Sequence, residues 1–336
     1  MKACDRLDVD FRVCVRLNTD FHSMKTLLTT DPDQAAEFIR GGGIVAFPTE
    51  TVYGLGANVF DERAVRKIFE AKERPADNPL IAHVGDRSQI AELSREINDA
   101  AHRLIDAFFP GPLTVVVKRS ARVPLIATAG LETIGIRMPR HELARRFLAA
   151  CGTPVVAPSA NISGRPSPTT WQAVYEDLDG RVDCILQGEA TEIGLESTVV
   201  DCTNEVPLVL RPGAVGIEEI RRIVPNAAVF AGNAEQAAVS PGMRHKHYSP
   251  RAKVVIVRNA SEAVGHGRSA FIGLEATSAH FDRVEVCASP NAYAHRLFAF
   301  FRECDSDKID VIYCQEVEEM GIGRALMDRL RRAAEA

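Results

Sequence analysis

The segment that most constrains the fold is 44–84, in which two short apolar runs enclose a helical pattern. Residues 44–47 are mostly β-branched or aromatic and lie between three glycines and a proline, which is typical of a buried strand. Asp61 can cap a helix over roughly 62–71, and a second strand over 80–84 completes the unit. This order of strand, helix and strand predicts an α/β fold.

Polar residues follow the first strand, and two cations follow the helix. Thr49, Glu50 and Thr51 come directly after the strand, where α/β proteins usually place ligands. Lys72 and Arg74 stand two apart in a segment broken by prolines, so we expect them to point to the same side. Together these residues predict an anion site, although a solvated helix end would carry the same two cations.

Composition limits the possible classes of protein. A chain of 336 residues, 46% hydrophobic and 25% charged, is expected to form about two globular domains. Its net charge of −5 argues against binding nucleic acid through bulk attraction. The eight cysteines include no C-x-x-C pair, so we expect reduced thiols and a cytoplasmic location rather than a zinc site or disulfides. The sequence has no apolar run of membrane-spanning length, no P-loop and no dinucleotide motif.

Later segments repeat the pattern of a short strand that runs into polar side chains. One alternating strand places Thr133 and Arg137 on the same face. The strand that ends at Ala157 runs into Ser159 and Asn161, whose polar tips are expected on one side. A hydrophilic turn would look the same, so this segment alone does not predict a site.

The rest of the chain contains two further polar positions, a linker and a second unit. Ser197 stands at the head of a β-branched strand, and Arg211 precedes a proline. Small and polar residues, followed by a cation-rich run, predict a linker over 231–250, in which an H-x-H pair lacks a third metal ligand. A second α/β unit is predicted over 251–336.

In this order the segments resemble the YrdC/Sua family of threonylcarbamoyl-AMP synthases. The matching stretches are FPTETVYGLG (47–56), AKERPADNPL (71–80), FPGPLT (109–114), IGIRMP (134–139), PSANISGRPSPT (158–169), ESTVVD (196–201), RPG (211–213) and SPGMRHKHYSP (240–250). The resemblance covers about residues 24–336 and points to the long, two-domain form.

The resemblance implies a fold and a division of the chain into domains. The expected α/β fold is a twisted, mostly parallel sheet of the YrdC-like type with a concave basic face, joined to a smaller Rossmann-like α/β domain. The expected parts are a variable N-terminal extension (1–23), a catalytic domain (24–230), a linker that closes over the active site (231–250) and a C-terminal domain (251–336).

The resemblance also implies a reaction. The family joins L-threonine, bicarbonate or CO2, and ATP into threonylcarbamoyl-AMP and pyrophosphate, with Mg2+ held mainly by the ATP phosphates rather than by a protein metal site. A tRNA threonylcarbamoyltransferase complex is expected to take the product and to modify the adenosine beside the anticodon. A weak direct contact with tRNA stays open, and no contact with a membrane is expected.

By motif position, the family pattern assigns roles to individual residues. The residues expected to act in catalysis are Lys72, Arg74, Ser159 and Asn161. The residues expected to contact ATP are Arg74, Asn78, Thr133, Ser159, Ser167, Arg211, His247 and Tyr248. The residues expected to contact threonine are Thr51, His83, Arg137, the Ala157 backbone and Ser197. His83 fits a buried core histidine as well, and the general base stays open between His83 and a phosphate oxygen.

Two other functions stay open from the sequence. A concave basic face could grip RNA directly, although the acidic net charge weighs against this. A carbamoyl-phosphate-using transferase would need further modules, such as a zinc finger, which a chain without C-x-x-C cannot build. One departure from the family is Asp328, where the long form more often has Asn, and we expect it to affect only the accessory domain.

Overall fold

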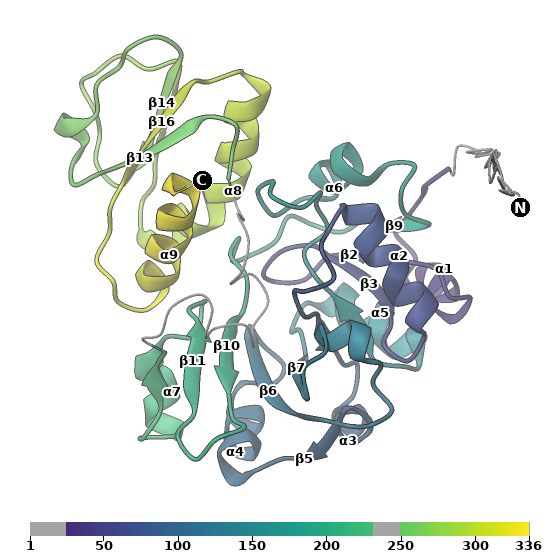
Figure 1. The fold of residues 1–336 in the computed structure, drawn as a ribbon. Coiled ribbons are helices and arrows are strands. Elements are labelled where there is room, and N and C mark those ends of the chain that lie inside the picture. Colours follow the sequence, from purple (N-terminus) through teal and green to yellow (C-terminus); the bar gives the residue numbers. More distant parts are fainter. Residues whose placement is uncertain (1–24, 231–248, 336) are drawn as a thin grey trace, which may run out of the picture.

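The computed structural model describes residues 25–230 and 249–335, and these residues form two sheets flanked by helices (Figure 1). The expected N-terminal extension and nearly all of the expected linker lie outside the described residues. The α/β fold predicted from the sequence is confirmed. Among the described residues, no helix has the length and apolar character needed to cross a bilayer.

The larger sheet belongs to the first unit and has the strand order β1-β9-β2-β3-β8-β4-β7-β6-β10-β11-β12, with β5 paired to β6. Its strands are β1 (Leu27–Thr29), β2 (Val45–Phe47), β3 (Gly54–Asn58), β4 (Ile81–His83), β5 (Ser94–Glu96), β6 (Leu113–Arg119), β7 (Thr133–Arg137), β8 (Val155–Ala157), β9 (Cys184–Leu186), β10 (Thr198–Asp201), β11 (Leu208–Arg211) and β12 (Ala228–Val229). Its helices are α1 (Pro32–Arg40), α2 (Glu62–Lys72), α3 (Ile90–Leu93), α4 (Asp99–Phe108), α5 (Glu142–Cys151), α6 (Trp171–Leu178) and α7 (Ile217–Ile223), with short 3-10 helices at Arg87–Gln89 and Leu125–Thr128.

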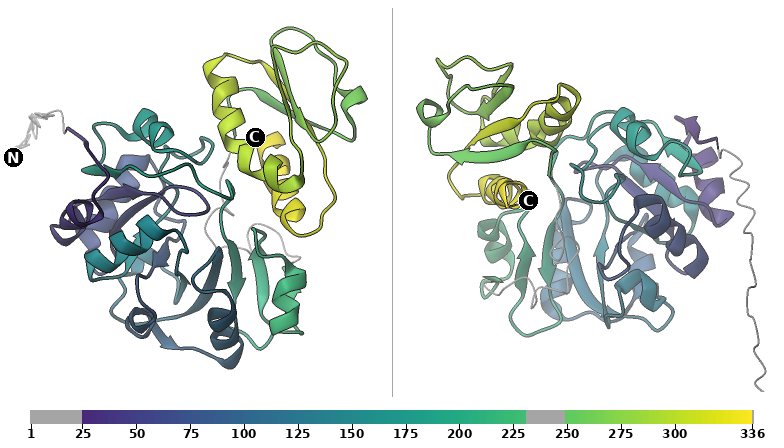
Figure 2. Two further views of the ribbon diagram at one scale, coloured as in Figure 1. Left: turned by 180° about the vertical axis from the view of Figure 1, so that it is seen from behind. Right: turned by 45° about the horizontal axis from the view of Figure 1, so that its top comes forward.

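The smaller sheet belongs to the second unit and has the order β13-β16-β14-β15, with every described pairing parallel. Its elements are β13 (Lys253–Val257), a 3-10 helix (Ala260–Glu262), β14 (Ser269–Gly273), β15 (Arg283–Val286), α8 (Pro290–Ser306), β16 (Val311–Gln315) and α9 (Ile322–Ala334). This unit lies beside the part of the larger sheet that carries β10 and β11, as two further views also show (Figure 2).

The larger sheet is mixed, so the expectation of a mostly parallel sheet is wrong. The strands β2, β3, β8 and β4 pair antiparallel in turn, as do β7 with β6 and β10 with β11. Parallel pairs such as β4 with β7 and β6 with β10 lie between them. The physical reason is that the chain turns back after β2 and pairs β3 with it as an antiparallel hairpin. A parallel pair would need a long crossover connection between the two strands.

The glycine-containing segment Gly54–Asn58 forms β3, a strand that was not predicted from the sequence. Asp61 caps α2 as predicted, by accepting hydrogen bonds from the amides of Arg63 and Ala64. The central unit is therefore β2-β3-α2-β4 rather than a single strand before the helix. Gly56 serves packing, because a Cβ there would lie only 2.6 Å from Cγ1 of Val155.

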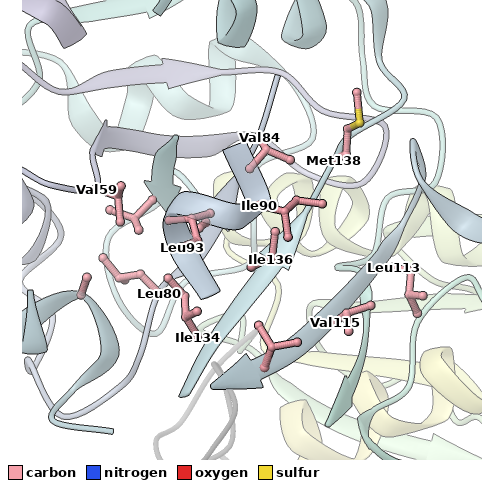
Figure 3. Packing of buried hydrophobic residues seen from close by; sticks show 14 of the residues in the cluster. Val59, Leu80, Val84, Ile90, Leu93, Leu113, Val115, Ile134, Ile136 and Met138 are labelled. Atoms are coloured by element: carbon pink, nitrogen blue, oxygen red, sulfur yellow. The ribbon is translucent and has the colours of Figure 1, made fainter. Parts of the chain in front are cut away.

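The two faces of the larger sheet are covered differently. On one face, strand residues such as Ile134, Ile136 and Val115 join Ile90 and Leu93 in the main hydrophobic cluster (Figure 3). On the other face, α1 and α5 cover only the part of the sheet around β2 and β8. Because neighbouring residues of a strand point to opposite faces, the other residues of β4 and β7 face the uncovered part.

The two units share a hydrophobic cluster. Val52 and Leu195 of the first unit pack among buried residues of the second, which include Leu297 and Phe298 of α8. Gly194 makes the closest approach, since a Cβ there would lie 2.6 Å from the Cα of His295.

We expect Gly194→Ala to lower the free energy of unfolding more than Gly152→Ala, measured by urea denaturation. Both glycines have a positive φ, +84° and +66°, so both variants carry a backbone penalty of about 1–2 kcal/mol. Only at Gly194 would the new Cβ also meet the backbone of α8, whereas nothing lies within 4 Å at Gly152. Equal losses in the two variants would contradict this packing of the units.

Candidate active site

A pocket lies on the uncovered part of the larger sheet. It is lined by Thr49, Thr51, Val52, Gly54, Arg74, Ile81, His83, Arg137, Ala157, Pro158, Ser159, Glu196, Ser197 and Arg211. Its volume of about 70 Å3 exceeds by several fold the roughly 10–15 Å3 that one water needs. The pocket can therefore hold a small polar molecule.

Strand register brings the lining residues to one face. His83 of β4 is paired with Arg137 of β7, and Ile81 is paired with Ala157 of β8. Paired residues in neighbouring strands share a face, as do residues two apart in one strand. The site is therefore built on the face of the sheet, and not only at strand ends as the sequence suggested.

Arg137 and Glu50 form a buried ion pair at the wall of the pocket. Nη2 of Arg137 lies 2.9 Å from Oε1 of Glu50, and Nη1 donates a hydrogen bond of 2.8 Å to Oγ1 of Thr51. Within the described residues, neither Glu50 oxygen nor Nε or Nη2 of Arg137 has a well-aligned hydrogen-bond partner. Buried polar groups in this state are uncommon and call for a ligand or an ordered water. From the sequence, Glu50 was expected in the polar segment after the first strand, but no individual role was assigned to it.

His83 is buried and uncharged. Burial, and next the positive charge of Arg137, lower its pKa to about 3, against the support that the carbonyls of Ile81 and Val155 give to the charged form. Its Nδ1 lies 3.1 Å from the Ile81 carbonyl and therefore carries the proton. A histidine with so low a pKa is a weak base near pH 7. Of the two bases left open by the sequence, this geometry disfavours His83.

Ser197 and Arg211 both line the pocket and are hydrogen-bonded to one another. Nε and Nη2 of Arg211 donate to the Ser197 carbonyl at 3.1 and 3.0 Å, and Nη2 also donates to its hydroxyl at 3.2 Å. The same hydroxyl lies 2.8 Å from Oγ1 of Thr114 on β6. These contacts fix the guanidinium of Arg211 at the pocket.

Lys72 does not line the pocket, although Arg74 does, and the expectation that the two point to the same side stays a prediction. The ammonium of Lys72 is buried and donates to the backbone carbonyls of Ser159 and Asn161. Burial, and then the charge of Arg74, hold the pKa of Lys72 well below its usual value. Glu73, between the two cations, adopts a left-handed conformation with φ of 52° at the end of α2. Lys72 therefore acts on the loop that carries Ser159.

Ser159 and Asn161, the S-x-N pair of this loop, form hydrogen bonds within the loop itself. Oγ of Ser159 donates to Oδ1 of Asn161, and Nδ2 of Asn161 donates to the carbonyls of Ile162 and Arg165 at 2.8 and 2.9 Å. Ser159 lines the pocket, whereas Asn161 is buried behind it. Asn161 thus supports the loop rather than facing a ligand.

Three of the residues expected to contact ATP lie outside the pocket lining. Ser167 is buried and donates a hydrogen bond of 2.6 Å to Glu196, which does line the pocket. The carbonyl of Asn78 accepts a hydrogen bond from Arg74 at 3.3 Å. Thr133 lies on the same face as Arg137 but four residues away, at the other end of β7.

The pocket thus brings together all five residues expected to contact threonine, and Arg74, Ser159 and Arg211 of those expected to contact ATP. His247 and Tyr248 lie outside the described residues. Thr49 and Glu196 also line the pocket, although the family pattern assigned neither of them a contact. Among the described residues, no group of three or more His, Cys, Asp or Glu side chains could hold a metal ion.

Comparison with known proteins identifies the family. Residues 37–213 match the family model described as "Telomere recombination", and residues 215–335 match "Threonylcarbamoyl-AMP synthase, C-terminal domain". The threonylcarbamoyl-AMP synthase of Pyrococcus abyssi is 44% identical over 315 residues, which are 89% of this chain and 93% of that protein. The chain belongs to the threonylcarbamoyl-AMP synthase family.

Other members of the threonylcarbamoyl-AMP synthase family agree with this result. The enzyme of Bacillus subtilis is 42% identical over 92% of this chain and 94% of its own length. The crystal structure of P. abyssi Sua5 complexed with L-threonine has a TM-score of 0.85 at 40% identity, covering 92% of this chain and 97% of that chain. The two-unit fold is thus shared over nearly the whole length.

We expect His83 to make the protein less stable in acid. Its pKa is about 3 in the folded protein and about 6.5 when unfolded, so below pH 6.5 only the unfolded chain takes up this proton. The contribution of neutral His83 to the free energy of unfolding is complete above pH 6.5. Below that pH it falls by about 1.4 kcal/mol per pH unit, so that at pH 5 it is about 2 kcal/mol lower.

The measurement is urea denaturation of the wild type and of His83→Gln at pH 7.5 and pH 5. Other groups titrate in both proteins. The difference between the two proteins in how the free energy of unfolding changes from pH 7.5 to pH 5 therefore reports on His83 alone. Parallel slopes would show that His83 is not held neutral in the folded protein.

Proposed function

We propose that this protein works as a threonylcarbamoyl-AMP synthase, which condenses L-threonine, bicarbonate or CO2, and ATP into threonylcarbamoyl-AMP and pyrophosphate. The observation that carries the proposal is that the expected threonine residues and three of the expected ATP residues line one pocket. The structure of P. abyssi Sua5 with L-threonine supports threonine as the ligand. Neither RNA binding nor carbamoyl-phosphate transfer has comparable support.

Threonine fits the half of the pocket around Arg137. An arginine can pair bidentately with a carboxylate, and a buried pair of this kind is stronger and more specific than a single ammonium contact. Thr51 and Ser197 place hydroxyls at the same pocket, and the Ala157 backbone lines it too. Because Nε and Nη2 of Arg137 are enclosed, binding requires a small rearrangement of the Glu50 contact.

In this proposal the phosphates of ATP contact Arg74 and Arg211, while the rest of the nucleotide extends beyond the pocket. A carbamate oxygen that attacks the α-phosphate adds charge to a polyanion, so fixed cations at this place lower the barrier. Ser159 lies beside them on the loop that Lys72 holds. In this proposal Lys72 and Asn161 act through the loop, and Ser167 acts through Glu196.

Mg2+ enters the proposal as part of the substrate, bound to the ATP phosphates. Glu196, the carboxylate in the pocket lining, already accepts a hydrogen bond from Ser167 and pairs with an arginine, which leaves it poorly suited as a metal ligand. Mg2+ would neutralise phosphate charge and help pyrophosphate to leave.

The proton of the threonine amine would pass to a phosphate oxygen, since His83 is too weak a base. The product would then go to a tRNA threonylcarbamoyltransferase complex. Direct contact with tRNA and a cytoplasmic location stay predictions from the sequence.

The first test is release of pyrophosphate from ATP with and without threonine and bicarbonate. We expect release to depend on both, and Arg74→Ala to lower it by about a hundredfold, which is typical of losing one well-placed donor. EDTA should abolish release, and Mg2+ should restore it. Turnover that ignores threonine would contradict the assignment.

A second test separates the two halves of the pocket. Arg137→Lys should raise the KM for threonine about tenfold or more and change the KM for ATP little, because lysine cannot form the bidentate pair. Arg140→Lys is the matched control, since Arg140 is half-exposed and pairs with the exposed Glu192. A threonine KM that stays unchanged in Arg137→Lys would place the carboxylate elsewhere.

A further inference from the structure

Several arginines of the C-terminal unit reach the first unit, and one of them pairs with a residue of the pocket lining. Arg329 of α9 is completely buried. Its Nε donates to Oε2 of Glu196 at 2.8 Å, and its Nη2 donates to the Pro212 carbonyl at 3.2 Å. Figure 1 shows α9 beside the strands β10 and β11. Glu196 comes shortly before β10 in the sequence, and Pro212 directly follows β11.

Both partners of Arg329 belong to the site. Glu196 lines the pocket and holds Ser167 through its second oxygen at 2.6 Å. Pro212 directly follows Arg211, which also lines the pocket. One guanidinium of the second unit therefore links, through Glu196 and Pro212, the segments of Ser167 and Arg211, which the family pattern assigned to ATP binding.

These segments are packed too tightly to move independently. A Cβ on Gly213 would lie 2.2 Å from the Thr198 amide nitrogen and 2.6 Å from the carbonyl carbon of Ser197. A shift of the Pro212 segment would therefore displace Ser197, and with it the hydrogen bonds that hold Arg211. The anchor at Pro212 acts on the position of a pocket cation.

The pair also solves an electrostatic problem. A lone carboxylate at Glu196 would repel a triphosphate in the pocket, and an unpaired buried charge is costly. The guanidinium of Arg329 supplies the opposite charge from the side away from the pocket lining. Asp328 in turn pairs with Arg329 at 2.5 Å and with Arg332 at 3.1 Å.

We propose that Arg329 is a positioning residue for the ATP half of the active site, acting by neutralising Glu196 and anchoring the segment that carries Arg211. This rests on the proposed function, because it assumes that the pocket binds ATP. It gives the C-terminal unit a role in substrate binding beyond that of an accessory. Within the threonine half, the contacts of Arg137 with Thr51 and Glu50 do not involve Arg329 or its partners.

The test compares Arg329→Gln with Arg324→Gln in the full chain. Arg324 lies on the same helix and also reaches across to the first unit, where it pairs with Glu218 at 3.5 Å, but it contacts no pocket residue. We expect Arg329→Gln to raise the KM for ATP at least tenfold and the KM for threonine at most threefold, the smaller effect passing through Ser197. Arg324→Gln should keep both values within twofold of the wild type.

A double variant distinguishes positioning from loss of structure. If the lone carboxylate causes the defect, Glu196→Gln added to Arg329→Gln should recover at least threefold of the lost ATP affinity. Arg329→Lys keeps the charge but cannot reach both partners, so it should fold and raise the KM for ATP about threefold to tenfold. If Arg329→Gln does not fold, the KM for ATP of Arg329→Lys is the deciding measurement.

An unchanged KM for ATP in Arg329→Gln, or in Arg329→Lys if only that variant folds, would overturn the inference. So would equal rises in both KM values without recovery in the double variant, which would mark Arg329 as a simple contact between the units. Failure of the proposed function looks different, because the wild type itself would then release no pyrophosphate in response to threonine.

Discussion

Burial of charged side chains on one face of the larger sheet is the constraint on which the rest of the site depends. A buried charge without a partner costs several kcal/mol, so each one must be matched. Arg137 is matched by Glu50, Arg211 is held by Ser197, and Glu196 is matched by Arg329. The pairs Arg137–Glu50 and Glu196–Arg329 join segments far apart in the sequence, and the three contacts together give the pocket its shape before any ligand arrives.

The sequence could predict the residues on strands better than their partners. The alternation in β7 placed Thr133 and Arg137 on one face, because the side-chain period of a strand is fixed. Only Arg74 of the cation pair lines the pocket, because the chain between Lys72 and Arg74 is not extended but passes through the left-handed Glu73. The strand β3 was not predicted, because glycines that make room for Val155 look like glycines that make a chain flexible.

Long-range partners left no signal in a single sequence. Nothing in the spacing of Glu196 and Arg329, 133 residues apart, indicates that they meet. The departure at Asp328 was expected to concern only the accessory domain, yet this carboxylate pairs with Arg329, which reaches the pocket wall. Burial opposes ionisation of Asp328, but the charges of Arg329 and Arg332 outweigh it and hold its pKa below the usual value.

This arrangement explains why the second unit is packed so closely against the first. The larger sheet leaves part of one face without a helix, and a face that carries ion pairs cannot be closed by an apolar helix alone. The second unit instead contributes an apolar surface that takes up Val52 and Leu195, and a single guanidinium for Glu196. Because Val52 also lines the pocket, the same contact that buries apolar area fixes the pocket wall. Stability and substrate binding are therefore coupled through one interface.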